Sequence, residues 1–99
     1  MVFDVSKIAG ISEFSEKEEK ERTLFLVQEK VFLVSNKNTI EIRCDSRLSK
    51  LLQEKYESVM ESRYFGRGGI EIVMSGQLAE NEVVDLVRLS YNLSKAEEE

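Results

Sequence analysis

Residues 39–56, TIEIRCDSRLSKLLQEKY, decide the fold class because they pass from the period of a strand to the period of a helix. Apolar and polar side chains alternate over residues 39–44, which is typical of a strand with one buried face and one solvated face. We expect Cys44 on the buried face and Glu41 and Arg43 on the solvated face. A helix is predicted to follow this strand at once.

That helix is predicted to begin at Asp45 or Ser46, because a short side-chain oxygen can accept a hydrogen bond from an N–H of the first turn. It is predicted to end near residues 56–60. The apolar stripe at helical spacing consists of Leu48, Leu51, Leu52 and Tyr56. The opposite, solvated side carries Arg47, Lys50 and Glu54.

The flanking segments supply the rest of an antiparallel sheet. Residues 23–27 and 31–34 have strand-like patterns separated by short turns, which predicts a meander that ends in the strand described above. Residues 70–74 alternate again and predict a fourth strand with Glu71 facing outward. Residues 80–95 predict a second helix. Its core face comprises Val83, Val84, Val87 and Tyr91, with Leu86 or Leu93.

Three segments are less regular. Residues 4–10 indicate either a short helix ended by Gly10 or a short strand. Residues 13–22 are dominated by charge and predict a solvated loop or the lead-in to a strand. Residues 61–69 contain three glycines in four positions and predict a loop. The expected fold is a two-layer α+β domain, in which an antiparallel sheet has its helices packed on one face.

The bulk properties limit the class of protein. The 99 residues are expected to form a single domain, 1–99. No apolar run approaches the roughly 18 residues of a membrane span, and no signal-peptide pattern is visible, so a cytoplasmic location is expected. The net charge of −5 argues against non-specific electrostatic binding to nucleic acid. Residues 43–67 nevertheless carry six basic and four acidic side chains, a local net charge of +2.

The residue types also argue against catalysis. The chain has no histidine, so neither Cys44 nor Ser90 has an activating base, and a zinc site is not expected. Cys44 is expected to be a buried, inert thiol, and Ser90 and Tyr91 are expected to be packing residues. Glu16 and Glu19 have lysines among them and lack calcium-type spacing. We therefore expect a non-enzymatic domain with no cofactor and no metal.

A longer pattern covers residues 42–99. It consists of a strand ending in Cys44-Asp45, a leucine-rich helix closing on Tyr56, a basic loop, a strand followed by Ser75-Gly76, and a last helix with Ser90-Tyr91. This pattern resembles the MmcQ/YjbR family. The resemblance implies a YjbR-like, double-wing α+β fold and DNA binding without a catalytic residue set or cofactor. Members of the family usually have a tryptophan just before the fourth strand, where this chain has Gly69.

The loop Arg63-Tyr64-Phe65-Gly66-Arg67 is the most suggestive surface. Arginine pairs with phosphate bidentately, and aromatic rings stack on bases. The alternative is that the Tyr64 and Phe65 rings pack at the edge of the core, while the arginines are solvent-exposed residues of a turn. The predicted nucleic-acid-binding residues are Arg43, Arg47, Lys50, Arg63, Tyr64, Phe65 and Arg67. For the first three, the alternative is a solvated face with ion pairs to Glu41 and Glu54.

Two functions remain open at this point. The first is DNA binding through the basic loop and the adjacent helix, which predicts salt-dependent affinity. The second is a protein-interaction module of the adaptor or chaperone-like kind, in which an exposed strand edge accepts a partner strand. A monomer without a membrane partner is expected in either case.

Overall fold

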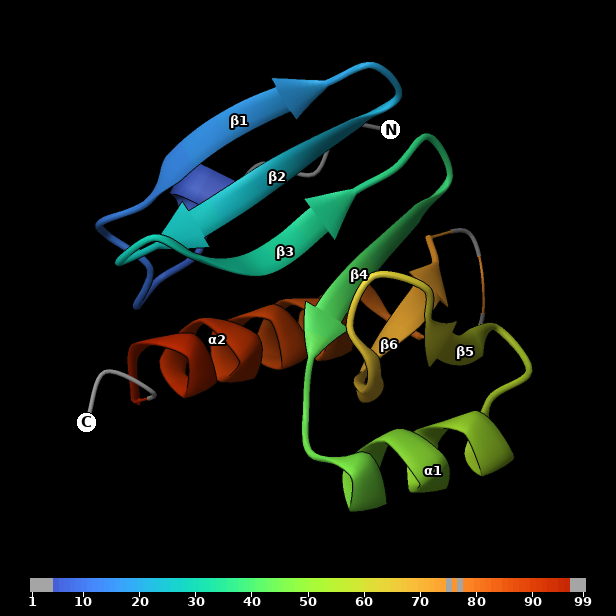
Figure 1. Ribbon diagram of the computed structural model, residues 1–99. Helices are drawn as coiled ribbons and strands as arrows, with labels where there is room; N and C mark the ends of the chain where they lie inside the picture. Colours follow the sequence, from blue (N-terminus) through green and yellow to red (C-terminus); the bar gives the residue numbers. More distant parts are fainter. Residues whose placement is uncertain (1–4, 75, 77, 97–99) are drawn as a thin grey trace.

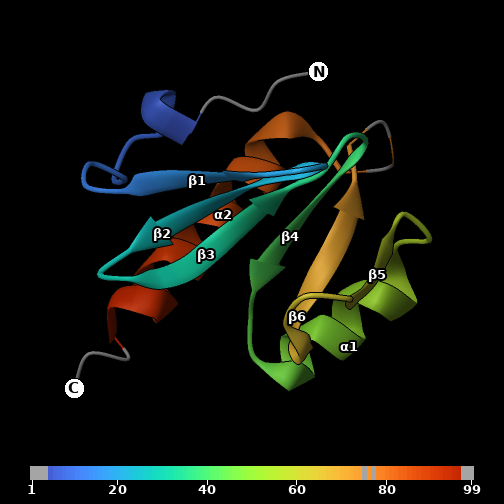
Figure 2. The ribbon, with the colours of Figure 1, turned by 45° about the horizontal axis from the view of Figure 1, so that its top comes forward.

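The computed structural model describes residues 5–74, 76 and 78–96 as a six-stranded antiparallel sheet with two α-helices (Figure 1). The elements are the 3-10 helix η1 (Val5–Lys7), β1 (Ser15–Glu19), β2 (Arg22–Val27), β3 (Lys30–Ser35), β4 (Thr39–Arg43), α1 (Ser46–Lys55), β5 (Val59–Ser62), β6 (Gly66–Val73) and α2 (Glu80–Ala96). The strands lie in the order β1-β2-β3-β4-β6-β5 (Figure 2). This arrangement confirms the predicted α+β class and the meander formed by β2, β3 and β4.

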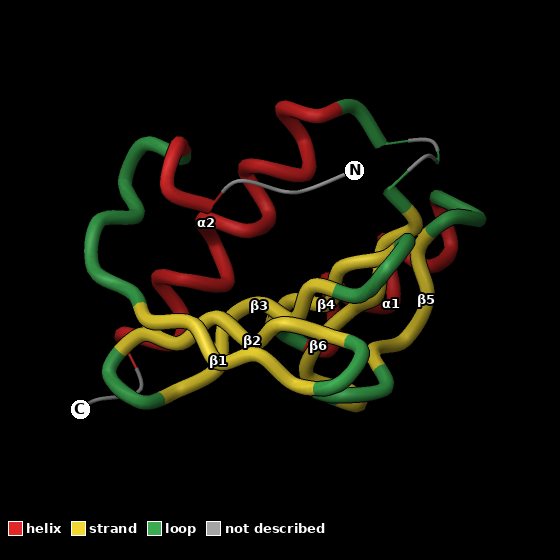
Figure 3. The backbone as a smooth tube through the Cα atoms, turned by 90° about the horizontal axis from the view of Figure 1, so that it is seen from above, coloured by secondary structure: helices red, strands yellow, loops and turns green. Residues whose placement is uncertain are grey.

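One face of the sheet carries the hydrophobic core. Phe25, Leu33, Ile42 and Ile70 are register partners across four adjacent strands, and all four are buried. Figure 3 shows α2 lying across this face. The buried apolar residues that α2 contributes are Val83, Val87 and Tyr91, and the predicted Val84 and Leu86 are partly buried against the same core. Leu48 and Leu52 of α1, and Tyr56 just after it, pack against the same cluster, so both helices share one core.

Leu51 corrects the predicted stripe of α1. Its side chain is 59% exposed, whereas Ser49 on the same helix is buried. The helix also ends at Lys55, because Tyr56 already has the extended backbone angles φ −126° and ψ 126°. No helix in the described part of the chain is long and apolar enough to cross a membrane.

The opposite face of the sheet is not solvated as expected. Leu24, Val34, Glu41 and Glu71 are register partners on this face, and none is more than 5% exposed. The turn between β5 and β6 folds over this side of the sheet in Figure 1, and it covers the two glutamates, because Tyr64 donates to Glu41 and Arg63 to Glu71. The prediction that Glu41 and Glu71 face solvent was therefore wrong, because alternation shows which face a side chain lies on but not what covers that face.

Two of the three irregular segments differ from expectation, and the third agrees with the short helix that was one of its two alternatives. Residues 15–19 form the edge strand β1 rather than a loop, because their backbone pairs with β2 while all five side chains remain exposed. Residues 61–69, expected as a loop, include the end of β5 and the start of β6. The segment 4–10 forms only the three-residue η1, and Gly10 has a φ of +93°. Residue 4 lies outside the described residues.

Candidate nucleic-acid interface

The turn between β5 and β6, residues 63–65, is anchored by the buried carboxylate of Glu41. This carboxylate accepts hydrogen bonds from the Ser62 hydroxyl at 2.7 Å and from the Tyr64 backbone N–H at 2.8 Å. Its second oxygen accepts a hydrogen bond from Asn36 Nδ2 at 2.9 Å. Burial alone would raise the pKa of Glu41, but the three hydrogen bonds outweigh burial and hold this pKa below its usual value. The ionised carboxylate therefore fixes the turn on the sheet.

Arg63 is paired within the protein. Its Nε and Nη2 donate to the two carboxylate oxygens of Glu71 at 2.9 and 2.7 Å, a bidentate arrangement. Thr39 donates a third hydrogen bond to Glu71 at 2.7 Å. The hydrogen bond to Glu71 raises the pKa of the Arg63 guanidinium. Although the Arg63 side chain is 75% exposed, the fork that would bind a phosphate already holds a carboxylate.

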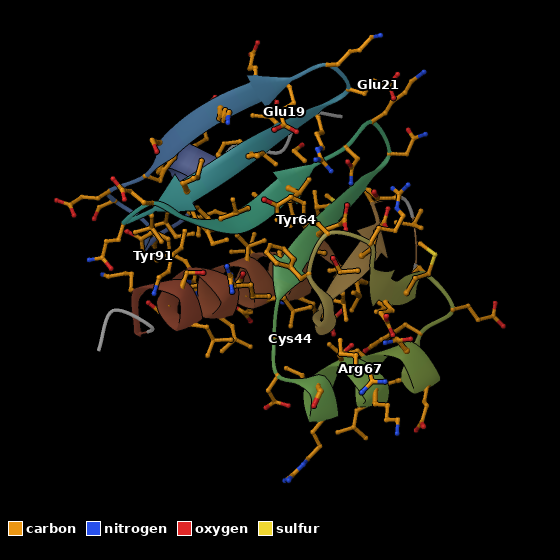
Figure 4. All side chains as sticks on the ribbon, in the orientation of Figure 1. Glu19, Glu21, Cys44, Tyr64, Arg67 and Tyr91 are labelled. Atoms are coloured by element: carbon orange, nitrogen blue, oxygen red, sulfur yellow. The ribbon has the colours of Figure 1, made fainter. Side chains whose placement is uncertain are left out.

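Both aromatic rings of the turn also have internal partners. The guanidinium of Arg22 lies 5.2 Å from the Tyr64 ring centre, and that of Arg43 lies 5.1 Å from the Phe65 ring centre. Arg43 Nε further donates to the Val31 carbonyl oxygen at 2.7 Å. Figure 4 shows Tyr64 over the sheet near β4. The face of each ring that its arginine covers is not available to stack on a base.

Gly69, which was expected just before the fourth strand, lies within β6, and the packing around it leaves no room for a side chain. A side chain at this position would contact the carbonyl oxygen of Ile42 and would lie only 2.7 Å from Phe65 Cβ. Real Cβ atoms essentially never approach another atom so closely. Phe65 therefore fills the space that a larger residue at position 69 would need.

A second group of predicted residues surrounds a hollow of about 590 Å³ between α1 and the start of β6. Arg47 and Lys50 come from α1 and Arg67 from β6, and all three are exposed. The hollow is also lined by Ser46, Ser49, Gln53 and Glu61. Figure 4 shows Arg67 beside α1. The charged lining residues carry a net charge of +2, on a chain whose net charge is −5.

Backbone contacts fix the two walls of this hollow. Asp45 caps α1, as predicted, by accepting hydrogen bonds from the Arg47 and Leu48 backbone N–H groups at 2.7 and 3.0 Å. The Ser49 hydroxyl donates to the Gly69 carbonyl oxygen at 3.1 Å, which ties α1 to β6. These bonds hold the first turn of α1 against the strand that carries the third cation.

The arginines of the chain divide into two groups. Of the six arginines, four have side chains engaged with other protein groups. These pairs are Arg22 with Glu19, Arg43 with Val31 O, Arg63 with Glu71, and Arg88 with Asp85. In the part of the chain that the structure describes, only the guanidinium groups of Arg47 and Arg67 have no ion pair or hydrogen bond. Both of these arginines line the hollow.

The seven predicted binding residues are thus split between two places. Arg63, Tyr64 and Phe65 form the turn that Glu41 and Glu71 hold on the sheet, here called the docked turn, and Arg43 of β4 packs against it. Arg47, Lys50 and Arg67 belong to the hollow. Sequence reasoning missed Ser62, Gln53 and Glu61. A signal for the docked turn was available, because Glu41 and Glu71 occupy equivalent positions between isoleucines in two of the predicted strands.

Three other residues behave as predicted. Cys44 is 3% exposed, and burial together with the nearby Asp45 raises its pKa to about 11. The buried Ser90 hydroxyl donates to the Phe32 carbonyl oxygen at 2.6 Å and accepts from the Arg43 N–H at 2.8 Å. Tyr91 is buried against the Phe32 ring. Among the described residues there is no group of three or more side chains able to hold a metal ion.

Comparisons with known proteins bear on the fold alone. No family model matches the chain, and no curated protein matches it. A crystal structure of a protein from Pseudomonas syringae superposes with a TM-score of 0.69 at 14% sequence identity, covering 82% of this chain and 86% of that protein. At this identity the likeness shows a shared two-layer α+β fold and carries no information about function.

Proposed function

We propose that this protein binds the phosphate backbone of nucleic acid at the hollow formed by Arg47, Lys50 and Arg67, in a non-catalytic role. The observation that carries the proposal is the convergence of the two unengaged arginines on one concave surface. Two guanidinium forks suit phosphate oxygens, and Lys50 adds a compact charge. The resemblance of residues 42–99 to the MmcQ/YjbR family supports the same proposal, and we extend it to membership of that double-wing family.

The rest of the molecule defines how such binding would behave. The acidic remainder of the chain repels a polyanion, so contact is confined to the hollow and its rim. A few phosphates are neutralised, and affinity falls with added salt because counterions are released. The hydrogen bond from Ser49 to Gly69 joins α1 to β6 and fixes the backbone that carries the cations, which reduces the ordering cost of binding.

The test is a fluorescence-anisotropy titration with labelled single-stranded and duplex DNA at several salt concentrations. The double variant Arg47→Gln/Arg67→Gln is expected to weaken binding and to make the slope of log affinity against log salt shallower by about 1.4 to 1.8. Exposed arginines on the rim of a hollow are not needed for folding, so the circular-dichroism spectrum should not change.

A matched control removes the same charge elsewhere. Lys20 and Lys37 are exposed and line a separate groove beside the β1–β2 and β3–β4 turns. The variant Lys20→Gln/Lys37→Gln should retain most of the affinity and the salt slope. If both double variants lost the same affinity for DNA, the loss would be due to net charge and not to the hollow. If the hollow variant kept its affinity, this surface would be ruled out.

A further inference from the structure

The two edges of the sheet are protected to different degrees. At one edge, β5 has only four residues, its pairing is irregular between Glu61 and Ser62, and α1 packs against it. At the other edge, β1 pairs regularly with β2 through all five of its residues, and all five side chains are exposed. Figures 1 and 2 show β1 as the outermost strand. No described residue pairs with its outer side, so that side presents unpaired N–H and C=O groups.

The register of β1 determines which charges line this open edge. Glu16 pairs with Phe25 and Glu18 with Thr23, so both glutamates lie on the core side of the sheet plane. Lys17 pairs with Leu24 and lies on the opposite side, together with Ser15 and Glu19. Acidic and basic side chains therefore alternate over residues 16–18 of this edge, and the strand as a whole has a net charge of −2.

Charge disfavours a second copy of the chain as the occupant. In the symmetric antiparallel pairing centred on Lys17, each Glu16 would stand opposite Glu18, and the two lysines would face each other. In the pairing centred on Glu18, Lys17 would stand opposite Glu19, but the two Glu18 side chains would face each other. Like charges directly opposite one another destabilise a strand pair. Each chain also carries a net charge of −5, which adds a general repulsion.

We infer that the outer edge of β1 accepts an extended segment of a partner protein by strand addition, and that this segment carries Lys or Arg at two positions two residues apart with an acidic residue between them. Backbone hydrogen bonds to the edge supply the affinity, as in other cases of strand addition. The two basic residues stand opposite Glu16 and Glu18, and the acidic residue stands opposite Lys17.

This docking surface is independent of the nucleic-acid hollow. The hollow lies beside β5 and β6, at the far end of the strand order from β1. The inference goes beyond the proposed function, and the two can fail separately. The variant Arg47→Gln/Arg67→Gln should leave strand addition unchanged.

The test uses a capped peptide, Thr-Val-Lys-Glu-Lys-Val-Thr, and its charge-swapped form, Thr-Val-Glu-Lys-Glu-Val-Thr. Binding is followed by NMR amide shifts of the full chain. The first peptide is expected to shift the amides of β1 and to bind about tenfold more tightly than the second, because three cross-strand pairs change sign. The triple variant Glu16→Lys/Lys17→Glu/Glu18→Lys should reverse this preference, and its fully exposed positions leave the fold intact.

A second control separates strand addition from charge attraction. The first peptide with N-methyl groups at alternate backbone nitrogens has the same charges but cannot form the ladder on one side. It should not shift the β1 amides. The inference is overturned if the methylated peptide binds equally well, if the triple variant keeps the original preference, or if shifts spread over the surface without centring on β1.

Discussion

The docked turn and the hollow contain the same kinds of side chain in different states. In the turn, Arg63 is held by Glu71, and the Tyr64 and Phe65 rings each lie beneath an arginine. In the hollow, Arg47 and Arg67 have no such partner in the described part of the chain, although the backbone around them is fixed. An arginine-rich and aromatic segment can therefore stabilise the fold, and the proposed binding surface lies where the guanidinium groups have no ion pair or hydrogen bond.

The difference also concerns what each region contributes to stability. The turn covers two carboxylates that would otherwise face water, and its hydrogen bonds are made by buried groups. Breaking such bonds leaves buried donors or acceptors without partners, which is costly. The three cations of the hollow have exposed side chains, and their removal leaves no buried group without a partner. Changes in the turn should therefore affect folding, and changes in the hollow should affect binding.

The largest expected effect comes from Gly69→Ala. The added methyl group would meet the Ile42 carbonyl and the Phe65 side chain, so the turn must move off the sheet. We expect the free energy of unfolding, measured by urea denaturation, to fall by about 3 kcal/mol. Gly68→Ala is the control, because the nearest atom to its new Cβ is 3.7 Å away, and it should have little effect. Equal effects at the two positions would show that the turn is not packed against position 69.

An intermediate effect is expected for Glu41→Gln. The amide nitrogen cannot accept the hydrogen bond from Asn36, so the variant should lose about 1–3 kcal/mol at pH 7. The pKa of Glu41 is lowered by folding. Its ionised form therefore stabilises the protein above the unfolded pKa of about 4.3, and this contribution is lost as the pH falls through the folded pKa.

The pH dependence supplies the measurement. Urea denaturation of both proteins between pH 7 and acid should show their stabilities converging below about pH 4. A constant difference across this range would mean that the charge of Glu41 does not anchor the turn.

The smallest expected effect separates Arg63 from Arg67. Arg63→Gln removes the bidentate partner of the buried Glu71 and should lower the thermal midpoint by less than Gly69→Ala does. Arg67→Gln changes an exposed side chain and should leave the midpoint unchanged. Thermal denaturation followed by circular dichroism tests both variants together. If Arg67→Gln lowered the thermal midpoint as much as Arg63→Gln, the docked turn and the hollow would not differ in their contribution to stability.

The parts of the fold that could be predicted from sequence are the segments whose apolar side chains indicate that they are buried. The strands β2 and β3 are short apolar runs, β4 alternates apolar and polar side chains, α2 has an apolar stripe, and each lies where it was expected. β1 could not be predicted because its membership of the sheet depends on backbone pairing with β2, and its side chains are all exposed. β5 is too short to show a period and follows directly after α1.

The sequence predicted which residue types form the candidate site, but not which of their side chains are paired within the protein. The basic and aromatic residues were identified, yet the pairing of Arg63 with Glu71 and of Arg22 with Tyr64 depends on contacts between segments that lie apart in the sequence. The same is true of the hollow, where β6 brings Arg67 to α1. The resemblance to the MmcQ/YjbR family and the DNA-binding role that it implies stay predictions.

Cys44, described above as a buried thiol, has one more consequence. It is the only cysteine in the chain, it lies at the junction of β4 and α1, and its N–H donates to the Gly68 carbonyl oxygen at 3.0 Å. With a pKa raised to about 11, the closed protein offers an alkylating reagent almost no thiolate. The rate of Cys44 alkylation therefore reports how often the junction between β4 and α1 opens. Cys44 is therefore a natural reporter of local unfolding in the segment that leads into α1, and no label has to be introduced into the chain.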